Sequence, residues 1–430
     1  DQCVDFIVSD CQYGIDGALP MIYTNASGTV AESLYGRATK AAAYALKARV
    51  LLYAASPLFN GNADYAKFAN EDGTLLFAPK DDSKWGKAAA AAKEAIDKIE
   101  GSSYYGLYYS DEPDNGYRNY MELFLPSKKW NKEYIFARNQ GTGYSDNIHQ
   151  EKCMAANGMG GWSGLCPTQE LVDAYEMANG STPIIGYNAD GTPIINGASG
   201  YSETGFAATA GKHYPAGVYN MYVGREPRFY ASINFNGQQW RGRQLEFWQG
   251  GKDGINVSKV DYCCTGYLLR KTADEGVDVI NGKGGMKEAS ILFRVGSLYL
   301  DYAEALNEAE GPVDDVYKYV DAIRKRAGLP GLAKGLDKDK MRERIQHERQ
   351  IELAFEAGHR YFDCHRWKIA EKTDNGYMHG MNITATNKVD YSKRSTVGDS
   401  RVFEKKHYLF PIPQSEMDKR IGLVQSPYWE

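Results

Sequence analysis

The chain has 430 residues, 43% of them hydrophobic and 24% charged, which is enough for a sizeable core and formally for two or three average domains. Its net charge of -5 and pI of about 5.9 argue against nucleic acid as the main partner, and no basic stretch reverses this balance. No apolar run reaches the roughly 18 residues that a membrane-spanning helix needs, so none is expected.

The first hundred residues read as helices. Residues 1–20 predict an amphipathic helix that places four residues inward: Val4, Ile7, Val8 and Cys11. Residues 37–55 predict an Ala-rich helix that stops at Ser56-Pro57, and its small side chains allow a neighbour to approach closely. The expected neighbour is a helix over 83–99.

A second helical hairpin follows much later in the chain. Apolar residues at helical spacing over 295–309 and 316–327 flank a Gly311-Pro312 turn. A further helix is expected over 341–357, with Gly358 ending it. Its apolar face would carry Ile345, Ile351, Ala354 and Phe355, with Glu348, Arg349, Glu352 and Glu356 spread around the rest.

Between these helices the composition changes. Gly, Asn, Tyr and Trp dominate residues 101–290, with a helical pattern at 167–175 and strand-like pieces at 228–235 and 267–271. Long irregular insertions in compact domains are usually functional. The residues after 370 read as an extended tail with Pro-bounded segments.

These patterns predict a mainly α protein: a tetratricopeptide-like helical-hairpin scaffold with a large irregular, loop-rich insertion carrying short β-strands. We expect a single domain with four regions: helical repeats at 1–100, an irregular aromatic-rich ligand-binding region at 101–290, helical repeats at 291–370 and an extended tail at 371–430.

The aromatic residues point to a binding surface. The chain holds 32 Tyr, 15 Phe and 7 Trp, and Tyr combines a flat apolar face with a polar tip, which suits sugars or peptides. A sugar site needs exposed aromatic rings with amides or guanidinium groups nearby. The stacking candidates are Trp162, Trp240, Trp248, Tyr201 and Tyr214, and the hydroxyl-binding candidates are Asn236, Gln239 and Arg241. For each Trp, packing in the core is the competing role.

No cofactor or metal is predicted. The cluster of His359, Asp363, Cys364 and His365 has no standard zinc spacing, and the calcium-loop echo at 60–71 has Tyr65 where Gly is needed. The seven cysteines include one pair that we consider as a disulfide, Cys153 and Cys166, and most are expected to be buried thiols.

Catalysis is not expected either, because the serine-hydrolase, zinc-protease and phosphate-loop motifs are all missing. A glycoside hydrolase, which needs two carboxylates across a cleft, is the rival of a different class. The pairs Glu170/Asp173 and Asp301/Glu304 would be its candidates, but both lie in helical patterns. A helical scaffold without a ligand is the other rival.

Six segments resemble one known family. ERQIELAFEAGHRYFDCHRW (348–367) is similar to the C-terminal signature of the SusD/RagB family of nutrient-binding lipoproteins. Five others resemble family segments in the family order: 37–61, PTQELVDAYEMANG (167–180), REPRFYASINFNG (225–237), 297–309 and LFPIPQSEM (409–417). Departures are small, with Glu226 where Asp is commoner and Ala357 where Gly commonly stands.

The resemblance implies an α-helical fold of four tetratricopeptide-like units. It implies a non-catalytic outer-membrane lipoprotein at the cell surface that binds oligosaccharide or polysaccharide and delivers it to a SusC-like TonB-dependent transporter. Peptide is the alternative ligand in the same family. We also expect an N-terminal portion with the lipid anchor, absent from this chain.

Overall fold

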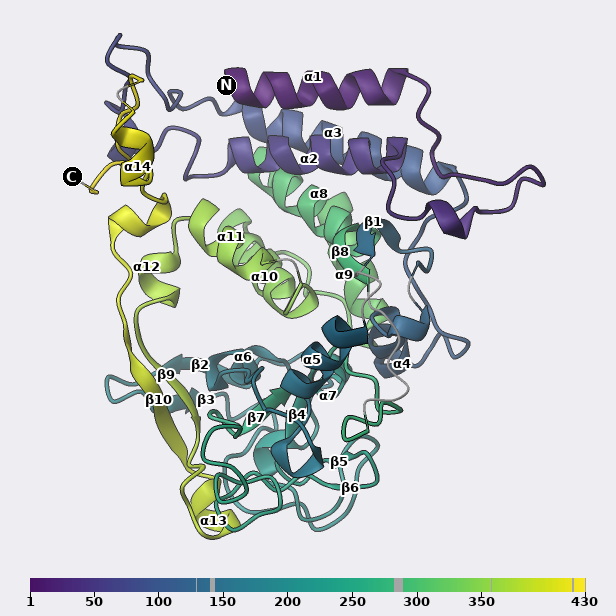
Figure 1. The fold of residues 1–430 in the computed structure, drawn as a ribbon, viewed down its shortest axis with the longest axis vertical. Helices are drawn as coiled ribbons and strands as arrows, with labels where there is room; N and C mark the ends of the chain where they lie inside the picture. Colours follow the sequence, from purple (N-terminus) through teal and green to yellow (C-terminus); the bar gives the residue numbers. More distant parts are fainter. Residues whose placement is uncertain (129, 140–143, 282–288, 357, 420, 430) are drawn as a thin grey trace.

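The computed structural model describes residues 1–128, 130–139, 144–281, 289–356, 358–419 and 421–429. Helices occupy the upper part of Figure 1, and an irregular region with short strands lies below them. The scaffold helices are α1 (Gln2–Asp16), α2 (Lys40–Ala55), α3 (Ser83–Gly101), α8 (Val295–Glu310), α9 (Asp314–Arg326), α10 (Lys338–Glu352) and α11 (His359–Arg366). The mainly α fold, with helical hairpins and a loop-rich insertion, is therefore confirmed.

The Ala-rich helix α2 packs against α3 as predicted. Thr39 caps α2 by accepting a hydrogen bond from the Ala42 amide at 3.1 Å. Its buried stripe of small residues lets α3 lie close, and α3 packs on α8 in turn. The main apolar core lies among these three helices.

The hairpin of α8 and α9 is also confirmed, with Gly311 in a positive-φ turn (90°) between them. The N-terminal helix α1 packs on α2 through Cys11 and Ile15, which are 6% exposed. Val4 and Val8 are half-buried, whereas Ile7 is 37% exposed, so its predicted inward position is wrong.

The prediction for 341–357 was wrong at its end. Helix α10 finishes at Glu352, and Phe355 has a positive φ of 63° and is 42% exposed. Gly358, in the left-handed conformation, begins α11 instead of ending α10. The positive φ of Phe355 interrupts the helix, so the residues after Glu352 leave the predicted helical face. The charged residues expected around this helix are buried, and they enter two ion-pair networks.

The first network joins the scaffold to the irregular region. Glu352 at the end of α10 lies 3.2 Å from Arg228 and 2.9 Å from Arg294, and it also contacts Arg326. Among the described residues the connected pairs contain six carboxylates and six cations, so the network is electrically balanced. The members are Glu133, Glu176, Glu226, Glu348, Glu352, Glu356, Arg228, Lys271, Arg294, Arg324, Arg326 and Arg344.

The second network holds α8, α10 and α11 together. Arg349 lies 2.6 Å from Asp301 and 2.9 Å from Asp363. Arg366 pairs with Asp363 and Glu304, and Arg49 of α2 completes the set at 3.5 Å from Asp301. Three cations thus meet three carboxylates, nearly all of them buried. Isolated buried charges are costly, and mutual pairing is what makes these tolerable.

The irregular region contains short elements around an aromatic core. Its helices are α4 (Gly116–Leu123), α5 (Tyr144–Met154), α6 (Gln169–Ala174) and α7 (Pro227–Ser232). Its strands are β1 (Tyr134–Asn139), β2 (Ile184–Tyr187), β3 (Pro193–Ile195), β4 (Ile233–Phe235), β5 (Gln239–Trp240), β6 (Arg243–Gln244), β7 (Tyr267–Leu269) and β8 (Ala289–Arg294). They form antiparallel pairs: β1 with β8, β2 with β3, β4 with β7 and β5 with β6.

Predictions for this region were mixed. The helix at 167–175 and the strand near 267–271 are confirmed as α6 and β7. Residues 228–235 are not one strand, since α7 occupies the first part and β4 the last. Helices α4 and α5 were not predicted. Many tyrosines are core residues here, for example Tyr175, Tyr222 and Tyr267.

The C-terminal part runs beside both halves. Helix α12 (Ala370–Thr373) leads into a hairpin of β9 (Gly376–Met381) and β10 (Arg394–Arg401), with α13 (Lys388–Tyr391) at its tip. The chain then returns toward the scaffold and ends after α14 (Gln414–Met417), as Figure 1 shows in yellow. Short 3-10 turns occur at Glu32–Leu34, Ala63–Tyr65, Pro126–Lys128, Asn157–Met159, Asn220–Tyr222 and Lys405–Tyr408.

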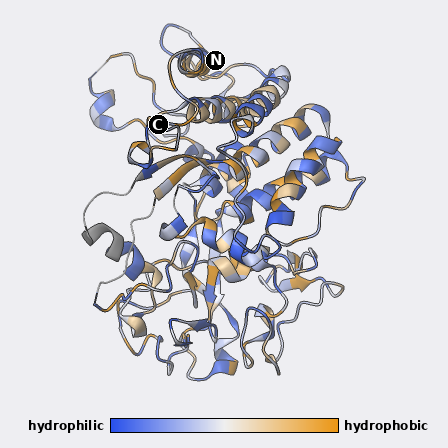
Figure 2. Cartoon of the chain, turned by 90° about the vertical axis from the view of Figure 1, so that its right-hand side faces the viewer, coloured by the Kyte–Doolittle hydropathy of each residue, from blue (hydrophilic) through white to orange (hydrophobic). Residues whose placement is uncertain are grey.

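Hydrophobic and hydrophilic residues alternate along the helices in Figure 2, as expected of helices with one buried face. Within the described part of the chain, no helix is long and apolar enough to cross a membrane. In the same ranges no group of three or more His, Cys, Asp or Glu side chains is arranged to hold a metal ion.

The cysteines are free thiols, so the Cys153–Cys166 bridge that we considered is not formed. The sulfur of Cys166 instead lies 3.9 Å from that of Cys263.

Candidate ligand-binding groove

A groove of about 330 Å³ opens in the irregular region. Four separate segments form it: Tyr117 on α4, the loop 211–215, the turn before β5 and the residue after β7. We call it the groove; its lining is Tyr117, Gly211, Lys212, His213, Tyr214, Pro215, Gln238, Gln239 and Arg270.

The β5–β6 hairpin decides which predicted residues reach the groove. Arg241 and Gly242 form its two-residue turn, both with positive φ (46° and 85°), as tight hairpin turns of this twist require. Because successive strand residues point to opposite faces, Gln239 is exposed and lines the groove, whereas Trp240 is 2% exposed in the core.

Planar groups stack beneath and along the groove. The Arg270 guanidinium lies 4.7 Å from the centre of the Trp240 ring and 5.6 Å from that of Tyr117. It also donates a hydrogen bond to the Tyr117 hydroxyl at 2.6 Å. The Tyr117 ring stacks on His213 at 4.6 Å, and His213 lies 5.2 Å from Tyr230. This wall is therefore a continuous stack of aromatic rings and one guanidinium.

The imidazole in this stack is neutral near pH 7. Burial lowers the pKa of His213 to about 4, and the cations Lys212 and Arg270 act in the same direction. A neutral imidazole offers one donor and one acceptor nitrogen, the pair of functions that a sugar hydroxyl can use.

Several polar side chains at the groove have no side-chain partner in the part of the chain that the structure describes. Among the described residues, Lys212, the Tyr214 hydroxyl and the Gln239 amide make no hydrogen bond or ion pair with another side chain. Lys212 and Gln239 are exposed and Tyr214 is half-buried, stacked 6.2 Å from Tyr230. These groups are free to bind a polar ligand.

The groove brings together two of the eight predicted site residues, Tyr214 and Gln239. Trp240 lies behind its wall, in contact with Arg270. Arg241 points elsewhere, pairing with Glu151 at 3.0 Å.

The remaining four lie outside the groove. Trp162 is 36% exposed beside Lys152, whose ammonium lies 5.1 Å from the ring centre. Trp248 is half-buried in the aromatic core. Tyr201 is buried and donates to Glu203 at 2.7 Å. Asn236 is 8% exposed and accepts from the Phe247 amide.

Sequence reasoning missed Tyr117, Lys212 and Arg270 as site residues. Tyr117 and Arg270 carry no local signal, because α4 was not predicted and Arg270 follows an ordinary core strand. Lys212 and His213 stand beside Tyr214 in a glycine-rich loop, and that loop composition is the signal that could have selected them.

The carboxylates proposed for a hydrolase are engaged by neighbours. Asp301 and Glu304 belong to the second ion-pair network. Asp173 pairs with Arg394 at 2.7 Å, and Glu170 lies 2.7 Å from a ring nitrogen of His379. None of these four lines the groove.

Comparison with known proteins agrees with this architecture. The SusD family model matches residues 126–429. The SusD-like protein P25 of Formosa agariphila is 42% identical over 82 residues, which is 18% of this chain but only 15% of that protein.

Solved structures match over the whole chain. BT4246 has a TM-score of 0.80 at 27% identity, covering 100% of this chain and 76% of its own. A SusD-like protein of Bacteroides fragilis (BF3747) has a TM-score of 0.70 at 28% identity, covering 100% and 71%. Since the family model spans more than half of the residues, the chain belongs to the SusD family.

Proposed function

We propose that this protein binds oligosaccharides without catalysis, and that the groove is the binding site. One observation carries the proposal: a stack of aromatic rings and a guanidinium ends in an open groove where Lys212, the Tyr214 hydroxyl and the Gln239 amide make no side-chain hydrogen bond or ion pair with a described residue. Family membership supports carbohydrate as the ligand class.

The groove offers both kinds of contact that a sugar ring needs. The half-buried ring of Tyr214 supplies a flat surface for the C–H face of a pyranose. Gln239, Lys212 and the neutral imidazole supply donors and acceptors for its hydroxyls. Its volume is at the lower end of the range of about 300–1,000 Å³ for small-ligand sites, enough for a short segment of a longer glycan.

We further propose that the protein acts at the cell surface, attached to the outer membrane by a lipid, and passes its ligand to a SusC-like TonB-dependent transporter. Family membership supports this role. A test is co-purification of the native protein with a transporter from outer membranes solubilised in mild detergent; recovery of the protein without any transporter would count against it.

The ligand proposal is tested by native affinity electrophoresis against a panel of polysaccharides. We expect one glycan to retard the wild-type protein, and Tyr214→Ala and Gln239→Ala each to weaken the retardation at least fivefold. Tyr377→Ala is the matched control, since Tyr377 is 54% exposed on β9 and does not line the groove.

Two results would change the assignment. If Trp162→Ala abolishes retardation while the groove variants bind normally, the exposed Trp162 surface is the site and the groove is not. If no glycan retards the protein but peptides bind it, the alternative ligand class is correct.

A further inference from the structure

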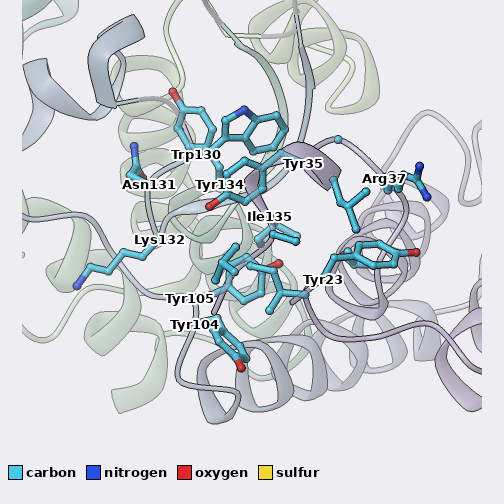
Figure 3. Close-up of a pocket in the computed structure, with 16 residues that line it drawn as sticks. Tyr23, Tyr35, Arg37, Tyr104, Tyr105, Trp130, Asn131, Lys132, Tyr134 and Ile135 are labelled. Carbon is cyan, nitrogen blue, oxygen red and sulfur yellow. The ribbon is translucent and has the colours of Figure 1, made fainter. Parts of the chain in front are cut away.

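A second cavity lies at the side of the scaffold and shares no lining residue with the groove. It has a volume of about 230 Å³ and forms where the loop 22–39 meets residues 104–105 and 130–135 (Figure 3). Because no lining residue is shared, it is a separate site.

Six of the sixteen lining residues are aromatic. Tyr35 and Trp130 stack at 4.6 Å with their planes 13° apart, and Tyr134 meets Trp130 edge-on at 6.2 Å. Tyr23 and Tyr104 stand on the other sides of the hollow in Figure 3. Tyr104 is 40% exposed, so its ring and hydroxyl are open to a ligand.

The charges of the lining are all positive. Among the described residues that line the cavity, Arg37 and Lys132 are the charged ones, and no carboxylate is included. Both are exposed, lie on opposite sides of the hollow and form no ion pair with a described residue. Glu32 is close enough to help burial raise the pKa of Tyr35, but it does not line the cavity.

The aromatic wall together with Arg37 and Lys132 suits a ligand that is both ring-shaped and anionic. The protein as a whole carries a net charge of -5, so a locally cationic cavity is where an anion would be held. Guanidinium and ammonium groups form strong charge-assisted hydrogen bonds with carboxylates. Flat aromatic walls and phenol hydroxyls suit the C–H faces and hydroxyls of a sugar.

We propose that this cavity is a second saccharide-binding site, which takes a uronic-acid residue of an acidic glycan. The sugar ring lies against the aromatic wall formed with Tyr35 and Trp130, and its carboxylate binds Arg37 or Lys132. The site acts independently of the groove, so the protein holds a long acidic chain at two points and gains affinity through the linkage.

The test uses tetragalacturonic acid and its methyl ester, which has the same rings without the charges, in isothermal titration calorimetry. We expect the acid to bind at least tenfold more tightly than the ester, with an affinity that falls as salt rises. The Arg37→Gln, Lys132→Gln double variant should abolish that preference. Tyr104→Ala should weaken binding of both probes.

The matched control is the Lys128→Gln, Arg138→Gln double variant, which removes two exposed charges on either side of the segment 130–135 in the sequence. Neither residue lines the cavity, so this variant should bind as wild type. The proposal is overturned if tetragalacturonic acid does not bind, or if the Arg37/Lys132 variant keeps its preference for the acid. Loss of acid binding in Tyr214→Ala alone would place that ligand in the groove. If tetraglutamate displaces tetragalacturonic acid at the same concentration as unlabelled tetragalacturonic acid does, the cavity recognises charge and not sugar, and the proposal is wrong.

Discussion

Replacing Glu352 by Gln tests how the first ion-pair network contributes to stability. The Glu352 carboxylate is fully buried and is shared by Arg228, Arg294 and Arg326. The amide keeps the shape of the side chain but removes one negative charge from a balanced set. Breaking a buried pair in this way costs about 3–5 kcal/mol, because it leaves an uncompensated charge in a low-dielectric interior.

The expected change in melting temperature follows from the size of the chain. With an unfolding entropy of about 2.1 cal/mol/K per residue, 430 residues give about 0.9 kcal/mol/K. A loss of about 3–5 kcal/mol then lowers the melting temperature by about 3–6 °C, provided that the chain unfolds as one unit. Urea unfolding followed by circular dichroism measures the free energy directly.

The control for this substitution is on the same helix. Glu343 of α10 is 64% exposed and pairs with Lys340 at 2.9 Å, so Glu343→Gln should cost less than about 0.5 kcal/mol. If Glu352→Gln lowers the free energy of unfolding by no more than this control, the three arginines do not depend on Glu352, and the network does not stabilise the fold through this carboxylate. Adding Arg326→Met to Glu352→Gln restores the charge balance, and we expect the double variant to cost less than the sum of the single ones.

Three further predictions concern acid stability, ligand binding and close packing. Burial favours a raised pKa at Glu356, but its cationic partners hold the pKa at about 2, below the unfolded value of 4.5. Its stabilisation is therefore complete above pH 4.5 and is lost as the pH falls toward 2. The urea midpoint should fall between pH 7 and pH 3, and it should fall less in Glu356→Gln than in the wild type. Because the pKa of His213 is about 4, glycan binding should be constant between pH 8 and 6 by calorimetry, whereas a titration step near pH 6.5 would contradict a neutral buried ring. A methyl group at Gly116 would lie 2.3 Å from the Ala327 carbonyl, so Gly116→Ala should destabilise the protein by about 1–3 kcal/mol in urea unfolding. Gly86 lies in open space within α3, so Gly86→Ala should stabilise the protein by about 0.4–1 kcal/mol in the same assay.

The parts of the fold that were predictable are those with local signals. The α8–α9 hairpin follows from apolar periodicity on both sides of a Gly-Pro turn, and helix α3 follows from its apolar periodicity. The charged face of α10 misled the prediction, because carboxylates at helical spacing look like a solvated surface. The burial of these carboxylates depends on Arg228 and Arg294, which lie far away in the sequence. Nothing in the local sequence of either arginine indicates that it pairs with α10.

The candidate site was predictable only where composition marks a loop. Tyr214 was selected because it belongs to a glycine-rich loop, and Gln239 because it is an amide beside a Trp. Trp240 was selected for its neighbouring amides and arginines, yet strand alternation turns it into the core. The other wall of the groove comes from Tyr117 and Arg270, which tertiary folding alone brings to the same place.

The two sides of the groove are held in different ways. Arg270 is directly followed by Lys271, which is buried and lies 2.6 Å from Glu356 in the first network. The loop 211–215 contains no residue of either network and closes on itself through the Gly211 amide and the Tyr214 carbonyl at 2.9 Å. Exchanging this short loop should therefore leave the scaffold intact. Ligand preference can then diverge between related proteins, or be redesigned, by replacing the loop side of the groove while the Arg270 side stays fixed.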